Sequence, residues 1–188
     1  MKIKVEQEFD YPLETLLRAR EERYKHLDKF PELKNVTIVE ENQAGDILTQ
    51  VRHISIAESM PGALSSIMPA DAAKLIESSE FKTSENLHTF EVIPGGGLDI
   101  FKITGVSSYY PLDGDRSGRN YQIEIKSKVF LAGPMIEGAI ADVYKKNLEK
   151  DKASIAHFIE LLAEEEAEAG NAGNTDTGPS EPAASSES

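Results

Sequence analysis

Residues 121–163 read YQIEIKSKVFLAGPMIEGAIADVYKKNLEKDKASIAHFIELLA, and they hold the two patterns that decide the fold of this chain. From Tyr121 to Leu131, apolar or small residues alternate with polar and charged ones, which is the period-two pattern of a strand with one buried face. After Gly133 and Pro134, apolar residues recur at helical spacing to the end of the stretch, and proline is tolerated in a first helical turn. The sequence therefore predicts a half-buried strand followed directly by a long helix.

Short strands and turns fill most of the chain before this stretch. Alternation predicts an N-terminal strand, and a helical segment begins near Pro12. Turn-forming residues then separate further predicted strands, which cover residues 36–41, 46–56, 75–83, 87–93 and 100–110.

Because the strands run together rather than alternate with helices, the order predicts an α+β protein. The final helix would span roughly 45 Å at about 1.5 Å per residue. A sheet that covers so long a helix has to wrap it. We therefore predict a helix-grip fold, a curved antiparallel sheet of about seven strands around the C-terminal helix.

Composition excludes several classes of protein. The chain has 188 residues, 39% of them hydrophobic, a net charge of −13 and no cysteine, so thiolate metal sites and disulfides are absent. An acidic chain lacks the basic clusters that nucleic acid requires. No apolar run approaches the ~18 residues of a membrane span, which predicts no integral membrane association. Charges interrupt the first residues, so no signal peptide is expected, and we predict a cytoplasmic location.

The last part of the chain differs from the rest. Seven of the 33 acidic residues and none of the 20 basic residues lie in residues 164–188. The segment is rich in Gly, Ala, Ser and Pro and cannot bury enough apolar surface to offset the entropy of ordering it. We predict one domain over residues 1–163, followed by a disordered acidic tail.

Two stretches carry a family resemblance. The opening KIKVEQEFDYPLETLLRA and the closing VFLAGPMIEGAIADVYKKNLEKDKASIAHFI resemble the START-like (SRPBCC or Bet v 1-like) superfamily. The layout is similar to uncharacterised bacterial START-like proteins and, more loosely, to PRELI-like lipid-transfer proteins. The resemblance implies a cavity between the concave face of the sheet and the C-terminal helix. It implies lipid or sterol carriage, polyketide cyclisation, hydrolysis or chaperone regulation as activities, and it leaves any protein partner open.

The phase of the strands predicts which residues line such a cavity. Glycine and serine at inward positions would leave space for a ligand, although the same positions could equally meet the helix and leave none. The predicted wall consists of Phe101, Ile103, Gly105, Ser107, Tyr109, Tyr121, Ile123, Ile125, Ser127, Ile140 and Tyr144.

A segment bounded by Pro61 and Pro69 holds flexible or branched apolar side chains. It would form a lid over the cavity, because methionine packs adaptably, or a short helix that plugs the end of the sheet. The predicted lid residues are Met60, Leu64, Ile67 and Met68.

Four histidines are the remaining candidates for chemistry. None has the spacing of a metal site, so we predict no metal and no cofactor. His53 and His88 lie in predicted strands, where an inward side chain could orient a ligand or act as an acid–base group. A hydrogen-bonded structural role would equally explain each of them.

These features favour non-enzymatic binding or carriage of a small apolar or lipid-like molecule. Burial of apolar surface would supply the affinity, at roughly 25 cal/mol per Å². The alternatives are a cyclase- or hydrolase-type enzyme that uses the same cavity and a protein-interaction module with a filled core.

Overall fold

The computed structural model describes residues 1–56, 60, 62–65 and 73–172. Seven strands form one antiparallel sheet in the order β1-β7-β6-β5-β4-β3-β2. The strands are β1 (Lys2–Phe9), β2 (Val36–Ala44), β3 (Ile47–Ser55), β4 (Lys74–Lys82), β5 (Leu87–Pro94), β6 (Phe101–Leu112) and β7 (Arg116–Ser127). The α-helices are α1 (Leu13–Glu22), α2 (Gly62–Ser65) and α3 (Gly133–Ala172), and 3-10 turns lie at Arg23–Lys25, Pro31–Leu33 and Thr83–Glu85.

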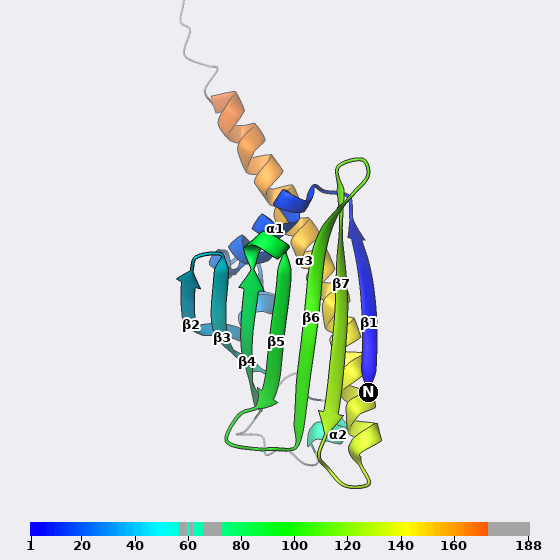
Figure 1. The fold of residues 1–188 in the computed structure, drawn as a ribbon. Coiled ribbons are helices and arrows are strands. Elements are labelled where there is room, and N and C mark those ends of the chain that lie inside the picture. Colours follow the sequence, from blue (N-terminus) through cyan, green and yellow to red (C-terminus); the bar gives the residue numbers. More distant parts are fainter. Residues whose placement is uncertain (57–59, 61, 66–72, 173–188) are drawn as a thin grey trace, which may run out of the picture.

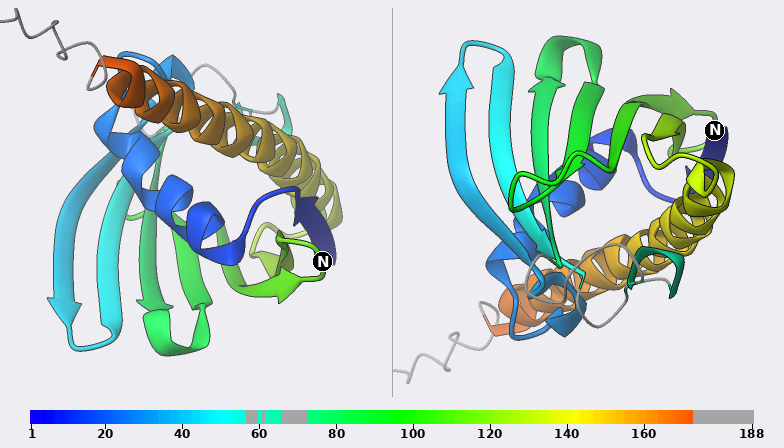
Figure 2. Two further views of the ribbon diagram at one scale, coloured as in Figure 1. Left: turned by 90° about the horizontal axis from the view of Figure 1, so that it is seen from above. Right: turned by 90° about the horizontal axis from the view of Figure 1, so that it is seen from below.

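The sheet curves around α3. Figure 1 shows this helix crossing behind the strands, and the end views in Figure 2 show the sheet as an arc with α1 and α3 on its concave side. The predicted α+β helix-grip fold is confirmed. Strand β7 lies next to the edge strand β1 and leads into α3 through a short loop. Residues 121–163 therefore provide both a strand of the sheet and the helix that the sheet grips.

The period-two pattern decides which side chains face the helix. Along β6 and β7 the inward residues are buried, and the register pairs Ile103 with Ile125 and Gly105 with Ile123. Intervening residues such as Lys102 and Lys126 are exposed. A one-residue slip would reverse both faces, so the apolar alternation fixes the register of these strands.

Two apolar clusters fill the concave side at opposite ends. The cluster near α2 includes Phe90, Val92, Phe101, Ile103, Ile123, Ile125, Ile136 and Ile140. The cluster near α1 includes Phe9, Leu16, Phe30, Phe81, Tyr109, Ile155 and Phe158. Polar residues lie between them and form what we call the polar band, defined as the buried Gln7, Arg20, Arg23, Arg52, His88 and Arg119 together with the partly buried Asp151.

Two element ends differ from the predictions. Helix α3 continues past residue 163, where the helical periodicity was traced, to Ala172. The Glu and Ala residues there are strong helix formers and extend a helix that is already nucleated. Residues 173–188 lie outside the described residues.

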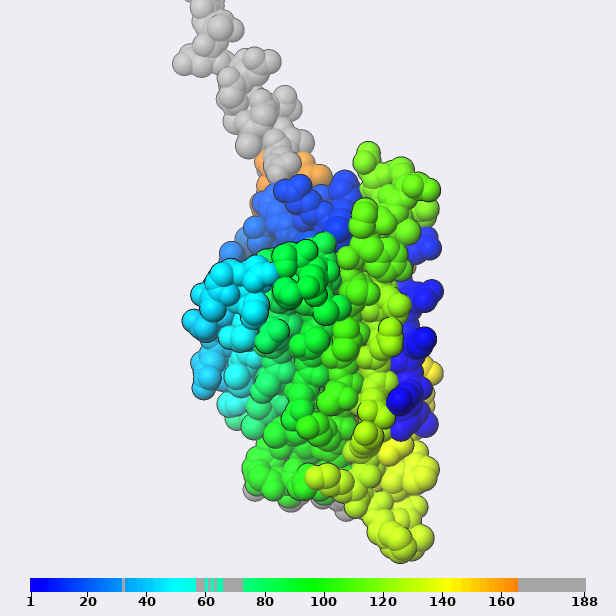
Figure 3. Space-filling view, viewed as in Figure 1, coloured from blue at the N-terminus to red at the C-terminus, as the bar shows by residue number. Residues whose placement is uncertain are grey.

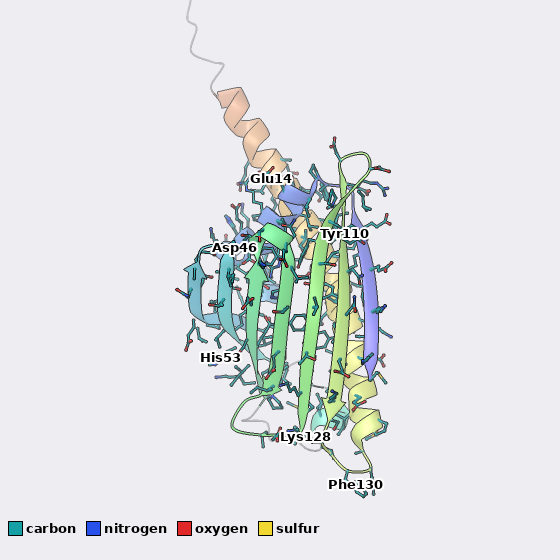
Figure 4. The ribbon with its side chains drawn as sticks, in the orientation of Figure 1. Glu14, Asp46, His53, Tyr110, Lys128 and Phe130 are labelled. Atoms are coloured by element: carbon teal, nitrogen blue, oxygen red, sulfur yellow. The ribbon has the colours of Figure 1, made fainter. Side chains whose placement is uncertain are left out.

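Strand β7 ends at Ser127 rather than at Leu131. Leu131 has a φ of 65°, and Phe130 and Leu131 are each 88% exposed. The loop that carries them projects beyond the sheet, and Phe130 lies at its tip (Figures 3 and 4). The alternation in the sequence therefore extends beyond the strand, because an apolar residue in a loop matches the same pattern.

Candidate functional site

A cavity of about 370 Å³ lies between the concave face of the sheet and α3. Its volume falls in the range of ligand sites, about 300–1,000 Å³. One half is apolar and includes Ile54, Ile56, Leu64, Leu75, Ile103 and Ile140. The other half is the cavity side of the polar band, with Arg20, Arg23, Arg52, His88, Arg119 and Asp151. The site is thus amphipathic, which the sequence did not predict.

A second hollow, of about 600 Å³, lies along β2 to β6 and includes Thr49, Glu80 and Thr89. It is broader and more open. The two hollows differ in how many buried polar side-chain atoms without a hydrogen-bond partner line them. Within the described ranges these atoms belong to seven residues, five of which line the inner cavity and none the second hollow. We therefore take the inner cavity as the candidate site.

Six of the predicted wall residues line this cavity. They are Phe101, Ile103, Tyr109, Tyr121, Ile140 and Tyr144. Ile123 and Ile125 are buried in the apolar cluster near α2, where β7 packs directly on α3. Ser127 lies at the end of β7, and its hydroxyl donates to the Ile100 carbonyl at 3.3 Å. These three residues support the fold beside the cavity and do not line it.

Gly105 does not leave the open space that the sequence predicted. The ring of Phe90 occupies it, and a Cβ added at Gly105 would lie 2.1 Å from Cζ of that ring. Glycine is therefore required here for close packing. Because Phe90 itself lines the cavity, the glycine determines how far the ring stands back from the ligand space.

The two candidate histidines, His53 and His88, differ in whether they line the cavity. His53 is not part of the cavity wall, since its neighbours Arg52 and Ile54 point inward and successive strand residues alternate in direction. His53 therefore faces away from the cavity, and it is labelled near β3 in Figure 4. His88 lines the cavity, and its Nδ1 lies 3.5 Å from Oγ of the buried Ser107.

The predicted lid is described only in part. Leu64 on α2 lines the cavity and is buried, and Met60 packs against the same apolar cluster. Ile67 and Met68 lie outside the described residues. The structure thus places one of the four residues on the cavity wall.

Asp151 holds two guanidinium groups of the polar band. It pairs with Arg23, and Nη1 of Arg119 donates to it at 2.7 Å. Gln7 accepts from Nη2 of Arg119 at 2.5 Å and donates to the Leu148 carbonyl at 2.9 Å. These four residues of the polar band therefore form a connected network that joins β1, β7 and α3. Such networks fix the relative position of the elements they join.

The other two arginines have different partners. Arg20 is ion-paired with Glu21 at 2.5 Å. Arg52 donates to Oε1 of Gln50 at 2.5 Å and lies 3.8 Å from the carboxylates of Glu21 and Glu77. The guanidinium of Arg20 also lies over aromatic rings, 4.5 Å from the centroid of Phe81. Such stacking stabilises a partly desolvated cation but leaves its in-plane N–H donors available.

The local field changes the acidity of neighbouring groups. Burial, followed by the charges of Arg20 and Arg52, lowers the pKa of His88 well below 6.5, so the imidazole is neutral. Burial opposes ionisation of Tyr109, but Arg20 and Arg119 outweigh it and lower the pKa of this hydroxyl. Burial raises the pKa of Glu77 despite the nearby arginines. The arginines therefore disfavour a positive charge on His88 and favour a negative charge on Tyr109, whereas burial disfavours the negative charge of Glu77.

Sequence reasoning missed all four arginines. Arg20 and Arg23 lie in a charged stretch that is typical of an exposed helix. The signal for the other two was available, because Arg119 and Arg52 have the same strand phase as the inward residues Tyr121 and Ile54. The expectation that arginine is exposed outweighed that phase.

The described residues contain no group of three or more His, Asp or Glu side chains arranged to hold a metal ion. Within the same ranges, no helix is both long and apolar enough to cross a membrane.

Comparison with solved structures places this geometry among known folds. Zhui aromatase/cyclase from Streptomyces sp. R1128 is similar at 11% identity and a TM-score of 0.60, over 85% of this chain and 93% of that one. Ara h 8.0201 is similar at 14% identity and a TM-score of 0.57, over 85% and 98%. A START superfamily protein from Mycobacterium smegmatis is similar at 14% identity and a TM-score of 0.50, over 86% and 98%. At these identities the likeness shows a shared fold.

The chain thus has the START-like helix-grip fold, which is the fold class that these structures share. Within that class, residues 4–159 match the family described as "Protein of unknown function (DUF2505)", and the chain belongs to that family. No curated protein matches the sequence.

Proposed function

We propose that the protein binds a small lipid-like molecule in the inner cavity and acts as a cytoplasmic binder or carrier rather than as an enzyme. The cavity itself carries the proposal. Its apolar half is continuous with the cluster near α2, so an apolar chain or ring placed there would leave water at roughly 25 cal/mol per Å². The volume of about 370 Å³ suits one acyl chain or one small ring system.

Native mass spectrometry of the gently purified protein, followed by solvent extraction, tests this proposal. We expect an apolar molecule to co-purify and to leave on extraction. Absence of such a molecule, together with no binding of the neutral fluorescent probe N-phenyl-1-naphthylamine to the extracted protein, would overturn it.

A matched pair of substitutions locates the binding. Val143 lines the cavity from α3, whereas Val106 is 40% exposed on the opposite face of β6. Val143→Trp should fill the cavity and abolish probe binding, and Val106→Trp should leave it unchanged. Equal binding by the two variants would place the ligand elsewhere.

Leu64 allows a test of the lid. It covers the apolar half from α2, and a serine there would weaken the cover. In a lid, Leu64→Ser should speed dissociation of the probe in stopped flow. An unchanged dissociation rate with lowered thermal stability would favour the plug instead.

Catalysis in the same cavity is the second candidate, and His88 favours it. Nε2 of His88 has no hydrogen-bond partner among the described residues, and the neutral imidazole could accept a proton from a bound molecule. If the wild type releases a molecule that differs in mass from the one retained by His88→Gln, the protein is an enzyme. Identical masses would favour the carrier.

A further inference from the structure

We propose that the ligand is a single-chain or single-ring amphipathic carboxylate, whose carboxylate is bound by Arg20 and Arg52 beside Tyr109. This inference rests on the proposed function and specifies the ligand of that site. Its basis is an excess of buried donors and positive charge at one end of a cavity whose other end is apolar.

The charges do not balance within the site. Four guanidinium groups meet three carboxylates there, those of Glu21, Glu77 and Asp151. Asp151 is fully engaged by two of the four arginines. Arg52 has its carboxylate neighbours only at 3.8 Å, beyond hydrogen-bond distance. The arginines therefore exceed these carboxylates by one positive charge, and Lys150, an exposed residue that also lines the cavity, adds another, so the site favours an anion.

Donor atoms remain unused at the same place. Among the residues that the structure describes, Nη1 of Arg20 and Nε of Arg52 have no hydrogen-bond partner, and the hydroxyl of Tyr109 lies beside the hydroxyls of Ser107 and Tyr121. Nη1 of Arg20 is ion-paired with Glu21 but does not hydrogen-bond to it. All three side chains are more than nine-tenths buried and line the cavity. Buried donors that stay unpaired are costly, so a ligand that pairs them gains that free energy.

The donors come from different elements and converge. Arg20 projects from α1, Arg52 from β3 and Tyr109 from β6. The Arg20 guanidinium lies 5.5 Å from the centroid of the Tyr109 ring. A planar carboxylate matches the fork of an arginine and can accept from a phenol with its remaining lone pairs.

The apolar half determines what is attached to the carboxylate. Ile103 and Ile140 line the cavity at the end toward α2, away from α1 and Arg20. A ligand with a carboxylate among the arginines would therefore extend its chain or ring toward α2. The volume of about 370 Å³ favours one chain over the two chains of a phospholipid.

The experiment compares dodecanoate, dodecyl phosphate and dodecanol as competitors of N-phenyl-1-naphthylamine on the extracted full-length protein at pH 7.5. Dodecanoate should displace the probe at a concentration roughly tenfold or more below that of dodecanol, since a hydrogen bond to a charged group contributes about 1.5–3 kcal/mol. Equal potency of the two would overturn the carboxylate inference and leave the proposed function intact. Tighter binding of dodecyl phosphate than of dodecanoate would also overturn it.

Failure of the proposed function gives a different result. In that case the probe itself does not bind, and no competitor has an effect. The comparison uses the wild type alone, so it decides the question whether or not any variant folds.

Two substitutions and a control assign the residues. Arg52→Gln and Arg20→Gln should each remove most of the preference for dodecanoate and leave dodecanol binding unchanged. Arg18→Gln removes the same charge from the outer side of α1, where Arg18 is paired with Glu22, and should keep the preference. A preference retained by both cavity variants would overturn the assignment, and circular dichroism would establish that they are folded.

Discussion

Arg119 on β7 donates to Asp151 on α3 across 2.7 Å, and the same carboxylate also pairs with Arg23. This relationship ties the central part of the long helix to the sheet at the level of the polar band. Both arginines are nearly fully buried, so removing Asp151 would leave two unpaired guanidinium groups in the interior.

Asp151→Asn should therefore lower the free energy of unfolding by about 3–5 kcal/mol, because an uncompensated buried charge is costly. Urea denaturation followed by circular dichroism measures this loss. Asp99→Asn is the matched control, since Asp99 is exposed and pairs with Lys128 at the surface. Its loss should stay within about 1 kcal/mol. Similar losses in both variants would show that the polar band contributes little to stability.

The same carboxylate should make the fold sensitive to acid. Burial opposes its ionisation, but Arg23 and Arg119 outweigh this effect and lower the pKa of Asp151 from 3.8 to about 2. A carboxyl group with a lowered pKa stabilises the fold fully above its unfolded-state value and loses this contribution as the pH falls further. Stability should therefore fall between pH 3.8 and 2 more steeply in the wild type than in Asp151→Asn. Parallel curves would contradict this assignment.

Gly105→Ala should destabilise the protein by roughly 1–3 kcal/mol, because the new methyl group would collide with the Phe90 ring. Gly62→Ala is the control, since no atom of the described residues lies within 4 Å of a Cβ at that position. Adding Phe90→Leu to Gly105→Ala should recover part of the loss, which a double-mutant cycle measures. Strict additivity of the two substitutions would show that the contact is not the cause.

Because of His88, the free energy of unfolding should depend on pH below pH 6.5. Burial and the charges of Arg20 and Arg52 keep its folded pKa well below 6.5, whereas the unfolded chain takes up the proton near 6.5. The unfolded state is therefore favoured progressively below pH 6.5. The difference in stability between pH 8 and pH 5.5 should be smaller in His88→Gln than in the wild type. An equal difference would show that another group is responsible.

Phe130 and Leu131 should contribute little to stability, although they are large and apolar. Both are 88% exposed, so changing both to serine should alter the free energy of unfolding by less than about 0.5 kcal/mol per site. Phe101→Ala, in the buried cluster near α2, should cost about 3–5 kcal/mol. A large loss in the loop variant would show that these side chains pack against something in solution.

The sequence predicted the fold well because the fold depends on local periodicity. Alternation along β6 and β7 and the helical spacing after Gly133 are both visible in short windows, and they determine which residues face the core. Predicted wall residues such as Ile103 and Tyr121 lie on the cavity for the same reason. Phase alone could not show that Phe90 fills the space above Gly105, since that depends on the conformation of a side chain on the neighbouring strand.

The chemistry of the site was harder to predict because it depends on pairing across long distances in the sequence. Arg23 and Asp151 are separated by 128 positions and meet only in the folded chain. An arginine with no visible partner in the sequence is expected at the surface. The helical periodicity was traced only to residue 163, whereas the Glu and Ala residues that follow continue α3 to Ala172.

The strand order places β1 and β2 at opposite edges of the sheet, so the strands form an open arc rather than a closed barrel. A closed barrel has a circumference fixed by its strand number and stagger. An open arc can widen by a change of twist and keep every ladder hydrogen bond. The volume of the cavity can therefore increase as the arc widens. Ligands of increasing length should lose affinity gradually rather than at one sharp limit.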